Sequence, residues 1–131
     1  VEAALKPRVW LKSGANIVIQ QTEALTVIDV NSGKNTAKKD KKRYHHAINL
    51  EAAREIAFQL RLRNLSGIII VDFIDLYDDA LEMELLSELR ALLKKDPVAA
   101  AVVDITKLGL VEITRKKQRK PLSEQLAAKQ S

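Results

Sequence analysis

One short segment constrains the fold more than any other part of the chain. Residues 68–74 read IIIVDFI, a run that is apolar on both faces of a strand and is interrupted only by Asp72. Such runs are typical of central strands that are covered on both sides. We therefore expect a β-sheet that holds this strand in its interior, with helices packed against it.

Two further patterns predict strands on either side of this segment. Residues 17–20 and 25–30 are β-branched runs with a short polar break between them, which is typical of a hairpin. In the second run alternation places Asp29 on the face opposite Thr26, Ile28 and Val30. Residues 101–106 and 110–115 predict a closing hairpin.

Two amphipathic helices are expected between these strands. In residues 49–63 apolar side chains recur at helical spacing, and Asn49 is the expected N-cap. A leucine stripe over residues 81–93 predicts a second helix, capped by Asp78 or Asp79. The order ββαβαββ specifies a mixed β-sheet with two main helices, in the α+β or α/β class.

The composition narrows the class of protein. The chain has 131 residues, enough for one domain, and it has no cysteine. Disulfides and thiolate zinc sites within these residues are thereby excluded, which fits a cytoplasmic location. No apolar stretch is long enough to span a membrane.

We expect residues 1–120 to form the domain and residues 121–131 a tail that is either weakly helical or disordered. Val1 in place of methionine suggests a piece of a longer protein.

Positive charge is concentrated in two short segments, residues 34–43 and 115–120. The net charge is +5, but these segments hold so much positive charge that the rest of the chain is acidic. Clustered lysines and arginines bind nucleic-acid phosphates, yet they also occur in solvated loops and tails. Since Tyr44 is the one aromatic residue close to either segment, we do not expect a base-stacking platform of the kind that many single-strand binders use.

Asp29 and Asp72 occupy matching positions, each near the carboxyl end of a β-branched run. The loop and helix between them have the length of a βαβ crossover, and parallel neighbouring strands would bring both carboxylates to one edge of the sheet. Such a pair repels unless a cation lies between the carboxylates, and magnesium suits it. Asn31 has the same orientation and could position a water or a phosphate oxygen. Alternatively, both aspartates are structural and pair with arginines or backbone N–H groups.

The remaining candidates are less specific. Asp75 begins a loop and fits a turn or a helix cap as well as it fits a ligand. His45 and His46 are adjacent in a basic segment without nearby carboxylates, so we expect no metal site there. The sequence contains no glycine-rich phosphate loop and no nucleophile elbow.

Several motifs resemble the ribonuclease E/G family of bacterial endoribonucleases. The matching segments follow the family order, and they are VWLKSG at residues 9–14, QTEALTVIDVNSG at 21–33, NLEAAREIA at 49–57, QLRLRNLSGIIIVDFID at 59–75 and LGLVEITRK at 108–116. Because the motifs are long and ordered, the resemblance is specific.

The resemblance implies that residues 1–120 are a DNase I-like catalytic subdomain. It implies that Asp29 and Asp72 hold Mg²⁺, with Mn²⁺ as an alternative, and that Asn31 supports the site. The implied reaction is hydrolysis of single-stranded RNA that leaves a 5′-phosphate, carried out by a homo-oligomeric parent protein. The basic residues expected to contact RNA are Lys34, Lys38, Lys39, Arg115 and Lys116.

The chain also departs from the family pattern. The family's other RNA-binding, 5′-end-sensing and zinc-linking regions have no counterpart in these residues. The sequence also differs from the family pattern at Ile48 and at residues 34–46 and 97–100. We therefore expect the chain alone to cleave RNA only weakly. Two alternatives remain: a non-catalytic, basic RNA-binding module with structural acids, and an assembly domain.

Overall fold

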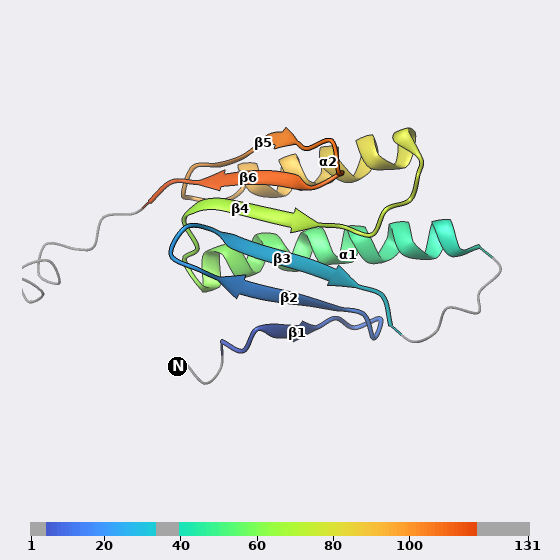
Figure 1. Cartoon of the computed structure of the whole chain (residues 1–131), viewed down its shortest axis with the longest axis horizontal. Coiled ribbons are helices and arrows are strands. Elements are labelled where there is room, and N and C mark those ends of the chain that lie inside the picture. Colours follow the sequence, from blue (N-terminus) through green and yellow to red (C-terminus); the bar gives the residue numbers. More distant parts are fainter. Residues whose placement is uncertain (1–4, 34–39, 118–131) are drawn as a thin grey trace, which may run out of the picture.

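The computed structural model describes residues 5–33 and 40–117, which form a two-layer α+β fold (Figure 1). One layer is a six-stranded sheet in the order β1-β2-β3-β4-β6-β5. The other layer is made of two helices that pack against each other and lie on the same face of the sheet. The elements are β1 (Arg8–Trp10), β2 (Asn16–Gln21), β3 (Thr26–Asn31), α1 (Lys41–Leu62), β4 (Gly67–Asp72), α2 (Asp79–Lys94), β5 (Ala100–Ile105) and β6 (Val111–Arg115).

The sheet is mixed, as the sequence predicts. β1, β2 and β3 form an antiparallel meander, and β4, β6 and β5 form a second antiparallel group. The two groups are joined by the parallel pairing of β3 with β4, and α1 is the crossover between these strands. The predicted class and the predicted order are confirmed apart from β1, a three-residue strand that the sequence analysis did not anticipate.

The hydrophobic core lies between the helices and one face of the sheet. Ile17, Ile28, Ile69 and Ile113 come from four neighbouring strands and are fully buried there. The opposite face, which we call the open face, carries no helix among the described residues. The core is therefore one-sided.

The expectation that residues 68–74 are covered on both faces is wrong. Ile69 and Val71 are buried under the helices, whereas Ile68 is 40% exposed, Ile70 is partly exposed and Asp72 is exposed on the open face. A continuous apolar run does not reveal that both helices lie on one side. On the open face the β-branched side chains of neighbouring strands provide the remaining cover.

The first helix begins earlier than predicted. Asp40 is its N-cap, with a carboxylate oxygen that accepts a hydrogen bond from the Arg43 backbone N–H at 3.0 Å. The apolar spacing used for the prediction marks only the buried part of the helix, whose first turns are basic and exposed. Asp78, one of the two predicted caps of α2, is confirmed, because it accepts from the Leu81 N–H at 3.1 Å.

Candidate active site

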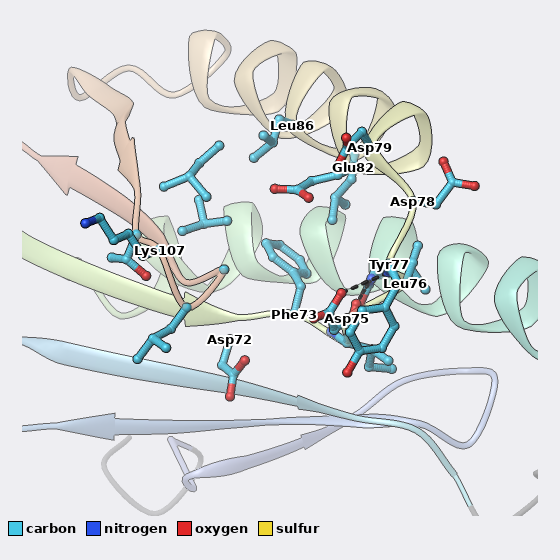
Figure 2. A pocket seen from close by; sticks show the side chains of 18 residues that line it. Asp72, Phe73, Asp75, Leu76, Tyr77, Asp78, Asp79, Glu82, Leu86 and Lys107 are labelled. Carbon is cyan, nitrogen blue, oxygen red and sulfur yellow. Dashed lines mark hydrogen bonds between the residues drawn. The ribbon is translucent and has the colours of Figure 1, made fainter.

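The parallel pairing of β3 with β4 makes Asp29 and Asp72 direct register partners. Both side chains are exposed, and both lie on the open face. Figure 2 shows the Asp72 carboxylate directed away from the helix layer. Since neighbouring strands are about 4.8 Å apart, the two carboxylates are close enough to share one cation. The sheet thus brings Asp29 and Asp72 to the same edge, as the sequence predicts.

The electrostatics of this pair reflect partial desolvation of Asp72 and the closeness of the two carboxylates. Desolvation first, and the neighbouring Asp29 carboxylate second, raise the pKa of Asp72 above its ordinary value. Two carboxylates and a nearby amide form an all-oxygen donor set of the kind that Mg²⁺ or Mn²⁺ binds while keeping several water ligands. Among the described residues no group of three or more His, Cys, Asp or Glu side chains gathers as a metal site. The two carboxylates by themselves match the few protein oxygen ligands that Mg²⁺ commonly takes.

Asn31 lies at the end of β3, two residues beyond Asp29 and on the same face. Its Nδ2 donates to Oδ1 of Asn16, its register partner on β2, at 3.4 Å. The same Oδ1 accepts a 2.6 Å hydrogen bond from Nη1 of Arg8 on β1. Asn16 is only 6% exposed, so two neighbouring strands fix the amide of Asn31.

Sequence reasoning missed Asn16 and Arg8 as parts of this site. The signal for Asn16 was present in the predicted hairpin, because pairing Ile17 with Val30 places Asn16 opposite Asn31. No comparable signal existed for Arg8, because β1 is too short to show alternation.

Arg115 is not available as an RNA contact, and this prediction is wrong for the described structure. Its side chain is 2% exposed, and its Nε and Nη2 donate hydrogen bonds to the Asp96 carboxylate at 2.8 and 3.2 Å. Nη1 donates to Asn64 Oδ1 at 3.0 Å and to the Leu65 carbonyl at 3.1 Å. Arg115 therefore ties β6 to the segments that follow α1 and α2.

Of the other predicted RNA contacts only Lys116 can be placed. Lys34, Lys38 and Lys39 lie outside the described residues. Lys116 is exposed and follows β6, at the end of the sheet where Arg115 pairs with Gly67. Because Gly67 and Asp72 are opposite ends of β4 and Lys116 lies one residue beyond the partner of Gly67, the backbone of Lys116 is about 20 Å from the carboxylate pair.

The weaker candidates have structural roles. Asp75 Oδ1 accepts from the Tyr77 N–H at 2.9 Å, so this residue shapes a turn. His46 is buried on α1, with Nε2 3.4 Å from a Glu84 carboxylate oxygen on α2. The helix packing thus accounts for the position of His46, and the expectation of no metal site at the histidines remains a prediction.

A cavity of about 370 Å³ opens beside Asp72, between the loop after β4, the start of α2 and the β5–β6 turn (Figure 2). Asp75, Asp78, Asp79 and Glu82 line it, with Lys107 on the opposite wall. The helix layer and this acidic cavity lie on one side of the carboxylate pair. The open sheet face is therefore the approach better suited to a polyanion.

Asn49 holds the loop after β4 in place. Its side chain is fully buried, donates through Nδ2 to the Ile74 carbonyl at 2.8 Å, and accepts from the Ile74 N–H at 3.0 Å. Ile74 lies two residues beyond Asp72. The α1 residue expected to cap a helix instead positions the end of β4.

Replacing Asn49 with alanine should lower the free energy of unfolding by about 1–2 kcal/mol. The change leaves both backbone groups of Ile74 without their partner, and the better helix propensity of alanine offsets only part of that cost. Urea unfolding of the purified chain measures the effect. Arg54→Ala, an exposed truncation on the same helix, should change stability by no more than about 0.5 kcal/mol. Equal stabilities of the two variants would contradict this role of Asn49.

The fold and the site define a two-layer α+β domain with an acidic pair and a fixed amide on its open sheet face. The chain belongs to the Ribonuclease E/G family, whose sequence pattern matches residues 1–118. It is 48% identical to a protein named Ribonuclease E from Synechocystis over 95% of its own length. It is 44% and 43% identical to proteins named Ribonuclease G from Haemophilus influenzae and Escherichia coli K12, in both cases over 93% of its length.

These relatives are much longer than the chain. It covers 18% of the Synechocystis protein and 25% of each of the two Ribonuclease G proteins. Within the residues that the structure describes, neither helix is both long enough and apolar enough to cross a membrane.

Proposed function

We propose that this chain is the catalytic subdomain of a magnesium-dependent endoribonuclease that hydrolyses single-stranded RNA. The observation that carries the proposal is the placement of Asp29 and Asp72 as register partners on an open sheet face. Membership of a family whose relatives are named Ribonuclease E and Ribonuclease G supports RNA as the substrate. The basic residues beyond β3 and β6 support a polyanionic substrate as well.

Each residue of the site has a separate role in this proposal. Asp29 and Asp72 would hold Mg²⁺, which when bound supplies an activated water and neutralises charge on the phosphate. Asn31 would orient the scissile phosphate through its amide. Asn16 and Arg8 keep that amide in one orientation, so that it needs little rearrangement when RNA binds.

RNA would reach the site along the sheet. Lys116 lies too far from the carboxylate pair to contact the same phosphate, so it would bind the RNA backbone farther along the strand. We further propose that the full-length protein works as a homo-oligomer, and that this chain by itself cleaves weakly because it represents a fraction of its relatives' length.

Titration of the ¹⁵N-labelled chain with Mg²⁺, and then with Mn²⁺, tests the proposal. We expect chemical-shift changes and paramagnetic broadening to centre on Asp29, Asn31 and Asp72, because the metal binds between the paired strands. The same chain with a 5′-labelled single-stranded RNA should give metal-dependent products that carry a 5′-phosphate. Broadening centred instead on residues 75–82, or RNA binding without any metal-dependent cleavage, would favour the non-catalytic alternatives.

A further inference from the structure

The open face carries an exposed tryptophan on the same side of the sheet as the carboxylate pair. Trp10, the one tryptophan of the chain, is 67% exposed at the end of the edge strand β1. Its register partner is Asn16 on β2, and the register partner of Asn16 is Asn31 on β3. A single cross-strand row thus connects the indole with Asn31 over two strand spacings, about 10 Å.

Arg8 lies over one face of this ring and leaves the other face for a ligand. Its Cζ is 5.8 Å from the centroid of the Trp10 ring, within the range of a cation–π contact. Nη1 of the same guanidinium donates to Asn16, which orients Arg8 and leaves its positive charge next to the indole. Arg8 stands in the neighbouring cross-strand row, which runs through Val18 and Asp29 to Asp72.

Tryptophan side chains are highly buried on average, so an exposed indole beside the carboxylate face offers a free aromatic surface to a ligand. A flat aromatic ring with an adjacent guanidinium suits a nucleobase, which stacks on the ring while its phosphate faces the cation. A strictly apolar partner fits poorly here, because the surface around the ring carries the Arg8 guanidinium and, one strand farther on, the partly exposed amide of Asn31. The position of this surface, continuous with the acidic pair, favours an occupant that also reaches the pair.

We propose that Trp10 and Arg8 form a base-stacking subsite for single-stranded RNA, next to the scissile phosphate. A base of the substrate stacks on Trp10, and the Arg8 guanidinium neutralises the phosphate beside that base. This inference rests on the proposed function, and it deepens that function by naming what holds the RNA in register with the carboxylates. The sequence analysis did not expect such a platform, because Trp10 is distant in sequence from both basic segments.

The intrinsic fluorescence of Trp10 reports directly on this subsite. A single-stranded oligouridine of about ten nucleotides is added to the intact chain in EDTA, so that binding is measured without metal or cleavage. Stacking should quench the fluorescence in step with the binding isotherm that fluorescence anisotropy of labelled RNA gives. An RNA of the same length made of abasic nucleotides carries the same charge and should bind without that quenching.

Substitutions separate stacking from charge and from bulk. Trp10→Leu should weaken binding of oligouridine about tenfold, the effect of losing one stacked base, and should leave abasic RNA binding unchanged. Trp10→Phe retains a ring and should keep most of the affinity. Phe58→Leu, at a 47% exposed aromatic on α1 in the other layer, is the matched control and should bind like the wild type.

Three outcomes would overturn the subsite. Normal RNA binding with unquenched Trp10 fluorescence, or with no loss in Trp10→Leu, would remove the base-stacking role and leave the metal proposal intact. Trp10 fluorescence that changes with protein concentration before RNA is added would show instead that this face joins two copies of the chain. Failure of the wild-type chain to bind any single-stranded RNA would end both proposals.

Discussion

Replacing Asp72 with asparagine is expected to weaken Mg²⁺ binding at least about a hundredfold and to abolish metal-dependent cleavage. Changes to residues that merely support a metal ligand commonly cost about 10–100-fold in affinity, and Asp72 supplies one of only two carboxylates at this site. Mn²⁺ binding followed by electron paramagnetic resonance measures the affinity. Cleavage of labelled RNA at saturating metal measures the activity.

The same substitution should raise the stability of the metal-free protein. The pKa of Asp72 is raised in the folded state, so its contribution to stability is present below the unfolded pKa and is lost as the pH rises through the folded pKa. At pH 7 the ionised carboxylate is partly desolvated and is also repelled by Asp29, and the neutral asparagine avoids both costs. We therefore expect a higher urea midpoint for Asp72→Asn at pH 7 and a smaller difference at pH 3.

Asp104→Asn is the matched control for this experiment. Asp104 is an exposed strand carboxylate on β5, separated from β4 by β6. Its removal should leave both Mn²⁺ affinity and cleavage unchanged. Metal affinity that falls equally in both variants would indicate diffuse electrostatic attraction rather than a site, and a lower stability of Asp72→Asn would contradict the repulsion between the two carboxylates.

Replacing Arg115 with methionine should lower the free energy of unfolding by about 3–5 kcal/mol. The substitution leaves the buried Asp96 carboxylate without its counter-charge, and Asn64 and the Leu65 carbonyl lose their donor. Urea unfolding at pH 7 measures the loss. Lys116→Met, the exposed neighbour, should change stability by about 0.5 kcal/mol at most, and equal effects of the two substitutions would show that Arg115 is not a structural anchor.

The Arg115 variant should also respond differently to acid. Burial of Asp96 acts to raise its pKa, but hydrogen bonds from Arg115 and from the Val98 N–H prevail, and the pKa is lowered. A lowered pKa gives stability that is present above the unfolded pKa and is lost as the pH falls through the folded pKa. The wild type should therefore lose more stability than Arg115→Met between pH 5 and pH 2. The double variant Asp96→Leu with Arg115→Met should recover part of the loss at pH 7.

The pairing of Asp29 with Asp72 could be predicted because it depends on patterns that are visible locally. Strand alternation gives the face of Asp29, and the crossover length gives the parallel neighbour. The role of Arg115 could not be found in the same way. A run of basic residues has the same sequence pattern whether its first member is solvated or buried. The partner of the buried Arg115 is Asp96, 19 residues earlier in the chain and just before β5.

The other differences have similar physical causes. The start of α1 was missed because its first turns bury little apolar surface, so they lack the periodicity on which a helix prediction depends. The open face was missed because isoleucines on both sides of β4 do not show where the helices lie. Trp10 was overlooked because only the register of β1 with β2 brings it into line with Asn31.

The single parallel pairing between described strands has a consequence for the folding of this chain. The β2–β3 and β5–β6 hairpins and the helix α1 depend on contacts close in sequence, whereas β4 pairs with β3 across the whole of α1, so we expect the local contacts to form before this pairing. A chain that has completed the local steps contains both aspartates but has not yet brought them together. Such a chain has no paired carboxylates, so catalysis that depends on them must await a late, non-local step of folding.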